Sequence, residues 1–195
     1  MIESALRLIA SELDQSLRLQ TAGASNIVVL SNLVDGHGAP LPDAADKVAA
    51  FLVNIEREDI PTRALRPLDA GQDRTGLIQP PVHLNLLVMF AASFNGPTYN
   101  EALKLIANTI AFFQARPVFN HNNTPGLDDD IEQLSLEIEN LNTTDLSNLW
   151  GILGGRYVPS VLYRVRMITI DGRRLERQPR RVEQVVSTLV PSGAD

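Results

Sequence analysis

The sequence of 195 residues contains no cysteine, which excludes disulfide frameworks, thiol catalysis and zinc sites built on thiolates. Long hydrophobic runs are missing too, because the most apolar window, Leu84–Phe94, is too short to cross a bilayer as a helix. Near the amino terminus, Glu3 and Glu12 interrupt the apolar residues, and no compact signal-peptide core follows. We therefore expect a soluble chain that is assembled in the cytoplasm and has no membrane partner.

Recognisable catalytic motifs are also missing. The sequence contains neither a G-x-S-x-G turn nor a G-x-x-x-x-G-K-[ST] phosphate loop. Its three histidines have no metal-binding spacing; they are His37, His83 and His121. The run Asp128-Asp129-Asp130 lacks the alternation of a calcium loop, which favours a solvated turn. We predict no enzyme activity, no cofactor and no metal, and expect binding or assembly instead.

What is present fits one domain. Of the residues, 44% are hydrophobic, and a chain of this length buries about 70% of its surface on folding. Helical periodicity predicts helices over residues 2–20, 99–114 and 144–153. Alternation predicts strands over residues 47–58, 82–94, 131–141 and 160–170, and short apolar runs predict strands at 26–31 and 118–119. A further strand at 181–189 is expected to return from a turn at Asp171–Gly172. The segment 131–141 also fits a helix, but its alternation as a strand is cleaner. The sequence thus predicts an α+β fold, in which helices pack on a mixed or mostly antiparallel sheet of about five to six strands.

Some of these patterns make finer predictions. The strand at 82–94 has one wholly apolar face, and polar residues near its ends predict that the other face is half buried. Thr143 or Thr144 is the predicted N-cap of the short helix. The helix at 99–114 is predicted to bury one stripe of side chains, namely Leu103, Ile106, Ala107, Ile110 and Phe113.

The carboxy-terminal part predicts a basic β-hairpin over residues 160–190. Asp171–Gly172 is the strongest short hairpin signal in the sequence, and the returning strand at 181–189 is ended by Pro191. The segment 59–81, by contrast, has no periodicity and contains four prolines. So long a segment without structure in a compact domain is either an interaction loop that orders on assembly or a mobile insertion.

Charge is distributed unevenly along the chain, whose net charge is −6. Residues Arg156–Arg181 contain eight arginines and two acids, whereas Pro117–Gly155 contain seven acids and no lysine or arginine. Both regions could be solvated faces, or they could meet across subunits as complementary surfaces. Nucleic-acid binding is disfavoured, because no aromatic residue stands among the arginines and the chain is acidic. The candidate residues of a subunit interface are Arg164, Arg166, Arg173, Arg174, Arg177, Asp128, Asp129 and Asp130.

Several separated motifs, in the correct order, carry a family resemblance. They are Pro80–Ala92 (PPVHLNLLVMFAA), Tyr99–Leu103 (YNEAL), Phe112–Gln114, Pro117–Phe119, Leu149–Gly151 and Tyr157–Arg166 (YVPSVLYRVR). This pattern resembles the cap, or tail-terminator, proteins of extracellular contractile injection systems, which are phage-tail-like particles of the antifeeding-prophage type. The resemblance covers residues 2–170, and the basic carboxy-terminal hairpin is matched less clearly.

The resemblance implies a structural role with no catalytic residues. Cap subunits would form a ring, expected to be hexameric, on the last tube and sheath layers of a particle that may be released. The ring would end polymerisation and anchor the sheath to the tube, so the implied partners are the tube protein, the sheath protein and copies of the chain itself. The alternatives are a baseplate or tube-adaptor subunit of the same kind of particle, a nucleic-acid-binding module and an enzyme with a site that no motif reveals.

Overall fold

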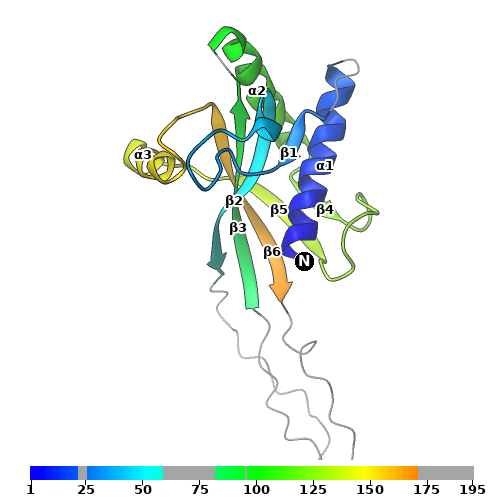
Figure 1. The fold of residues 1–195 in the computed structure, drawn as a ribbon. Coiled ribbons are helices and arrows are strands. Elements are labelled where there is room, and N and C mark those ends of the chain that lie inside the picture. Colours follow the sequence, from blue (N-terminus) through cyan, green and yellow to red (C-terminus); the bar gives the residue numbers. More distant parts are fainter. Residues whose placement is uncertain (22–25, 59–81, 95, 171–195) are drawn as a thin grey trace, which may run out of the picture.

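The protein is seen in a computed structural model, which describes residues 1–21, 26–58, 82–94 and 96–170. A six-stranded sheet organises these residues, with helices on both of its faces (Figure 1). The helices are α1 (Ile2–Gln20), α2 (Tyr99–Ala115) and α3 (Thr143–Ile152), with short 3-10 turns at Pro42–Ala44 and Gly96–Thr98. The strands are β1 (Val28–Leu30), β2 (Lys47–Arg57), β3 (Val82–Ser93), β4 (Val118–Asn120), β5 (Gln133–Ile138) and β6 (Ser160–Ile170).

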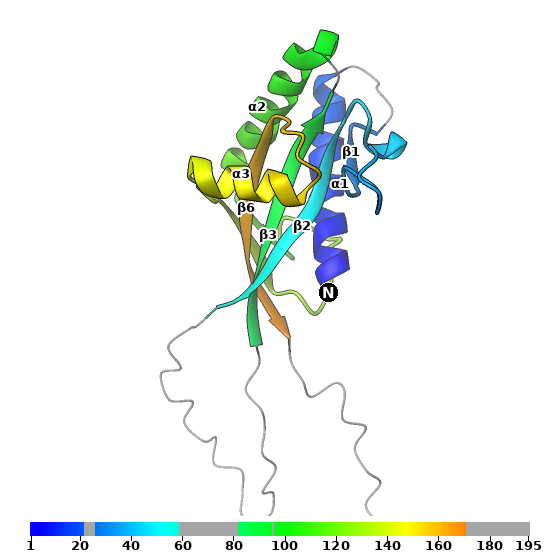
Figure 2. The same ribbon diagram turned by 60° about the vertical axis from the view of Figure 1, so that its left-hand side comes forward.

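The strand order across the sheet is β1-β2-β3-β6-β5-β4. The β1–β2 pair is parallel and every other pair is antiparallel. The predicted α+β fold with a mixed sheet is therefore confirmed, as is the strand interpretation of residues 131–141. The long strands β2, β3 and β6 continue together past the helices, and their ends lie at one end of the molecule (Figures 1 and 2).

The main core lies between the sheet and the pair α1 and α2. The helix predicted over residues 2–20 is confirmed as α1, and its Leu6, Ile9, Leu13 and Leu17 are all buried in the main core. Aromatic rings fill the centre. The rings of Phe113 and Tyr163 have centroids 4.9 Å apart, and Phe90 packs on both. The rings of Phe112 and Phe119 also pack on Phe113. Burial raises the pKa of Tyr163 to about 12.

A second, smaller core lies on the opposite face of the sheet, under α3 (Figure 2). Trp150 of α3 and Leu33 of the loop after β1 cover Leu87 and Met89 of β3. The prediction that this face of β3 is only half buried is therefore wrong, since residues 85–92 are buried on both faces. The reason is tertiary, because α3 and the loop arrive from distant parts of the sequence.

Two local predictions are also corrected. In α2 the buried residues are Ala102, Leu105, Ile106, Thr109 and Phe113, whereas Leu103 is 46% exposed. Apolar residues cover a wide arc of the helix opposite Glu101, Lys104 and Asn108, so its sequence did not decide which part of this arc faces the sheet. The cap of α3 is Asn142, one residue before the predicted threonines, and its Oδ1 accepts the Asp145 N–H at 2.8 Å.

Parts of the carboxy-terminal hairpin and the whole 59–81 loop lie outside the described residues. The first strand of the hairpin is β6, and its alternation is confirmed, since Tyr163 and Val165 face the main core. The turn at 171–172 and the returning strand at 181–189 are not described. The pairing of β6 nevertheless limits such a hairpin. Both sides of β6 are occupied around residues 163–166, by β3 on one side and β5 on the other.

Candidate assembly surface

Arg164 is the centre of a charged cluster on the sheet face that also carries α3. It lies opposite Leu87 of β3 in register, beyond the apolar residues of the second core. Its Nε donates to Glu139 Oε2 at 2.8 Å, and its Nη1 donates to Glu56 Oε2. One guanidinium thus joins the segment after β5 to β2 across the sheet.

This arrangement changes the acid–base behaviour of its members. The hydrogen bond from Arg164 lowers the pKa of the Glu139 carboxyl below its ordinary value. The same bond, with the one to Glu56, raises the pKa of Arg164, so its charge is permanent. Glu139 and Arg164 therefore form an ion pair that is fully charged at neutral pH.

Arg166 continues the cluster towards the end of β6. Its Nη2 lies 3.1 Å from Glu137 Oε2 of β5, and both side chains are substantially exposed. A β-bulge lies beside it, where the register of β3 and β6 shifts between Leu84 and Leu86. The predicted interface arginines of β6 are thus both engaged with acids of their own chain. The sequence pattern of alternating charges on β5 and β6 was the signal that could have indicated this pairing.

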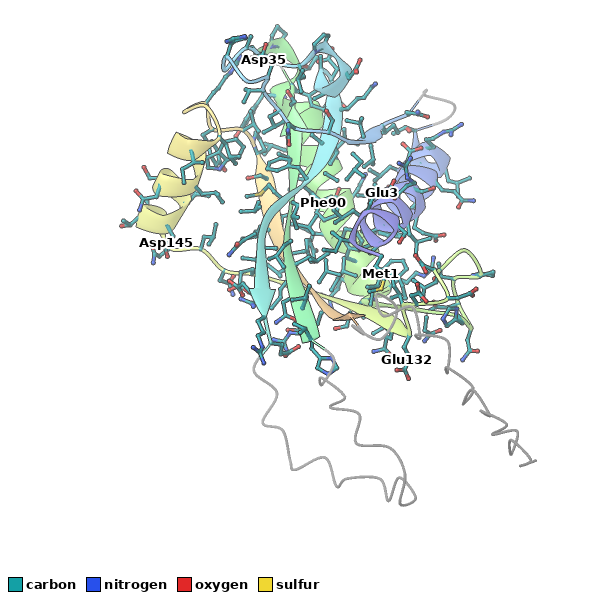
Figure 3. All side chains as sticks on the ribbon, turned by 60° about the horizontal axis from the view of Figure 1, so that its bottom comes forward. Met1, Glu3, Asp35, Phe90, Glu132 and Asp145 are labelled. Carbon is teal, nitrogen blue, oxygen red and sulfur yellow. The ribbon has the colours of Figure 1, made fainter. Side chains whose placement is uncertain are left out.

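The aspartate run occupies a different place. Asp128 accepts a hydrogen bond of 2.6 Å from the Ser4 hydroxyl and lies 3.6 Å from the Met1 amino group. The Ser4 bond, followed by one from the Asp130 N–H, lowers the pKa of Asp128. Asp129 is exposed. Since α1 packs on the main-core face, these aspartates lie away from the Arg164 cluster, and Figure 3 shows Met1 apart from Asp145 near α3.

The remaining candidate residues, Arg173, Arg174 and Arg177, lie outside the described residues. The structure therefore brings Arg164 and Arg166 together, but with Glu56, Glu137 and Glu139 rather than with the aspartate run. The uneven charge of the sequence is partly balanced within one chain.

Exposed apolar side chains form two further surface features that sequence reasoning missed. Tyr99 and Leu103 lie one turn apart at the start of α2, with 48% and 46% of their surfaces exposed. Ile152 and Tyr157, near the end of α3, are 84% and 57% exposed. The four-residue spacing of Tyr99 and Leu103 places both on one side of the helix. Because a buried stripe has the same spacing, the sequence did not show that these two side chains are exposed.

Chemistry-bearing residues do not converge in the described part of the chain. His37 lies in the turn after β1, His83 on β3 and His121 after β4. The described residues contain no group of three or more histidine, cysteine, aspartate or glutamate side chains that could hold a metal ion. No helix among them has the length and apolar character needed to span a bilayer.

These features define an α+β domain whose notable surfaces are ion-paired and apolar patches, as in proteins that bind other macromolecules. The chain belongs to the Pvc16 N-terminal domain family, which matches residues 5–184. No curated protein matches the chain.

Four solved chains are similar to this one, and two of them are components of contractile injection systems. One is the PVC sheath/tube terminator of an extracellular contractile injection system in the extended state, with 15% identity and a TM-score of 0.45 over 95% of this chain and 64% of that chain. The other is the anti-feeding prophage cap, with 16% identity and a TM-score of 0.46 over 94% of this chain and 59% of that chain. The chain thus spans about three fifths of the length of these solved chains.

Proposed function

We propose that this protein is the cap, or tail terminator, of a contractile injection system. In this role, copies of the chain form a ring on the last tube and sheath layers, end polymerisation and hold the sheath to the tube. Its partners are the tube protein, the sheath protein and further copies of itself, with six copies as the expected ring. The protein works without catalysis and assembles in the cytoplasm into a phage-tail-like particle.

Membership of the Pvc16 N-terminal domain family over residues 5–184 is the observation that carries this proposal. The ordered motifs from Pro80 to Arg166, which resemble cap proteins, support it independently of any single residue. The surface agrees with an assembly role, because fixed ion pairs and exposed apolar side chains are features of contact surfaces.

Particle length after deletion of the gene tests the proposal. Without a terminator, tube and sheath polymerisation has no defined end, so particles imaged by electron microscopy should vary in length and show frayed far ends. A plasmid copy of the intact gene should restore uniform particles. Uniform particles with intact far ends in the deletion strain would contradict the proposal. Loss of all particles, with a tagged chain located at the baseplate, would instead favour a baseplate subunit.

The 59–81 segment is the proposed contact with tube or sheath. Glu58 donates its N–H to the His83 carbonyl at 2.9 Å, so β2 and β3 remain adjacent where this segment leaves the sheet. Deletion of residues 62–78 would leave six residues to join two neighbouring antiparallel strands, a length that hairpins accommodate. The shortened chain should keep its circular dichroism spectrum but fail to bind tube–sheath assemblies. Unchanged binding would remove this segment from the contact.

A further inference from the structure

The two edges of the sheet differ in whether their outward-facing backbone groups have hydrogen-bond partners. At the β4 edge, Asn123 folds back on the strand: its Nδ2 donates to the Val118 carbonyl at 2.8 Å, and its Oδ1 accepts the Asn120 N–H at 2.9 Å. The Asn120 carbonyl accepts the N–H groups of Asn123 and Thr124. The Val118 carbonyl and both backbone groups of Asn120 are thus satisfied by the turn that follows β4, and edges covered in this way are less available to an added strand.

The opposite edge is open along half of β2. The edge strand β1 pairs only with Val48–Ala50, and the last contact is the Ser31 N–H on the Ala50 carbonyl at 3.2 Å. In the described part of the chain no strand lies along the outer side of β2 beyond Ala50. Because Glu58 directs its N–H to β3, strand alternation directs the backbone groups of Ile55 and Arg57 outward.

An apolar groove runs beside this open edge. It lies between the first turns of α1 and the β1–β2 edge, has a volume of about 470 Å³, and is lined mainly by Ile2, Leu6, Leu30 and Leu52. The β-bulge between Leu52 and Asn54 places Ile55 in register with Leu86 of the main core, so Ile55 faces the same side as the groove. Ile55 is 44% exposed. An added strand would cover these side chains and pair with the outward backbone groups.

The chain itself contains a suitable occupant. β6 ends at Ile170, at the same end of the molecule as β2 (Figures 1 and 2), and 25 residues follow it. The strand predicted at 181–189 contains no proline, and four of its nine residues are apolar, namely Val182, Val185, Val186 and Leu189. It cannot pair with residues 163–166 of β6, because β3 and β5 occupy both sides there. The segment 59–81 is a poor alternative, since its four prolines disfavour strand pairing.

Distance permits this connection. The ten residues 171–180 can span about 33 Å when extended. The outer side of β2 is three strand spacings, about 14 Å, from β6. We propose that residues 181–189 of this chain add to the open edge of β2 at Leu52–Arg57, with the apolar side chains of one strand face, such as Val182 and Val186, over the groove. The inference does not depend on the proposed function, because it concerns a contact of the chain with its own carboxy-terminal segment.

Disulfide scanning tests the contact in the purified full-length protein, which has no cysteine of its own. Asn54 is exposed, and its backbone faces β3, so it would be a non-hydrogen-bonded position towards an added strand, where opposite Cα atoms lie about 4.5 Å apart. Asn54→Cys is combined with a cysteine at each of positions 182–189 in turn. We expect disulfides at alternate positions after mild oxidation.

A monomer-sized band on a non-reducing gel shows that the strand comes from the same copy and supports the proposal, whereas a product that is only dimer-sized would assign the strand to a second copy and overturn it. Asn122→Cys beside the closed β4 edge, combined with the same second cysteines, is the control and should form none. Absence of any disulfide with Asn54→Cys, or equal yields at every position and with the control, would overturn the proposal.

Hydrogen exchange provides a second measurement without cysteines. Amides of residues 181–189 should exchange at least tenfold more slowly than in a free peptide of the same sequence. Ile55→Pro removes an outward-facing N–H that β3 does not use, so the fold should persist while this protection is lost. Peptide-like exchange of 181–189 in the unaltered, folded chain would also overturn the proposal.

Discussion

At the residue scale, Arg164 makes side-chain contacts that extend across the sheet. It joins Glu56 of β2 to Glu139 beyond β5, and its side chain is 21% exposed. Removal of the partly buried Arg164 guanidinium would leave the carboxylates of Glu56 and Glu139 without their hydrogen-bond donor and without a positive charge nearby. This makes Arg164 a structural residue of one chain, whatever further contacts it makes in an assembly.

We expect Arg164→Met to lower the free energy of unfolding by about 1–2 kcal/mol, since hydrogen bonds to charged groups are lost at a site of intermediate exposure. Arg7→Met is the matched control, because Arg7 pairs with Glu3 at a site where both side chains are mostly exposed. The control should change stability by no more than about 0.5 kcal/mol. Urea denaturation followed by circular dichroism measures both, and equal effects would contradict the special role of Arg164.

The same cluster predicts a dependence on pH. Arg164 lowers the pKa of Glu139 in the folded state, so the unfolded chain binds a proton more readily than the folded one. The resulting stabilisation is present above the unfolded pKa of about 4.3 and is lost as the pH falls through the lower folded pKa. The stability difference between the unaltered chain and Arg164→Met should therefore shrink between pH 7 and pH 3. A difference that is constant with pH would disagree with this explanation.

A cap residue gives a third prediction. Asn142 accepts the Asp145 N–H at the start of α3, whereas Thr143 is the first residue of the helix. We expect Asn142→Ala to cost about 1 kcal/mol of unfolding free energy, because one N–H of the helix start loses its acceptor. Thr143→Ala should cost less than about 0.5 kcal/mol. A larger loss of stability for Thr143→Ala than for Asn142→Ala in thermal melts would indicate that the threonine is the cap, as the sequence predicted.

At the element scale, α3 decides whether the second face of the sheet is covered. Its ten residues bury only Trp150 fully, and this indole packs over Leu87 and Met89 of β3 and against Tyr157, with ring centroids 5.5 Å apart. Because a short helix has little stability of its own, α3 is held mainly by this packing.

We therefore predict that Trp150→Ala destabilises the protein by about 3 kcal/mol or more. Ile152→Ala on the same helix is the control, because Ile152 is 84% exposed, and it should stay within about 0.5 kcal/mol. Chemical denaturation followed by far-ultraviolet circular dichroism is suitable, since the substitution removes the chain's one tryptophan. A loss below about 1 kcal/mol would mean that α3 contributes little to the fold.

At the scale of the whole molecule, charge distribution is the feature relevant to assembly. Arg164 and Arg166 are paired within the chain, which leaves Arg173, Arg174 and Arg177 as the candidate basic side of a contact between subunits. A ring needs two different, complementary surfaces on each copy. Exposed acids such as Asp129 could supply the other side.

Charge reversal tests this arrangement. Replacement of Arg173, Arg174 and Arg177 by glutamate should prevent ring formation at physiological salt, because complementary potentials become repulsive. Size-exclusion chromatography with light scattering reads the oligomeric state. Substitution of the same three residues by lysine keeps the charge and should leave assembly largely intact. Normal rings of the glutamate variant would exclude charge pairing by these arginines.

Much of the architecture was predictable because it depends on local periodicity. The helix α1 and the strands β2, β3 and β6 are long, and the periodicity of their apolar residues was enough to predict them. The fold class follows from that pattern, and the family resemblance follows from motifs such as Pro80–Ala92. These properties require no knowledge of which elements become neighbours.

The tertiary structure alone decided the contacts between distant residues. Burial of the second face of β3 depends on Trp150, about 60 residues away, and the exposure of Leu103 depends on how α2 is rotated on the sheet. The pairing of Arg164 with Glu56 and the open edge of β2 likewise arise from strand order. A sequence specifies each element through short-range periodicity, whereas packing, ion pairs and free edges are settled by long-range proximity that no local pattern records.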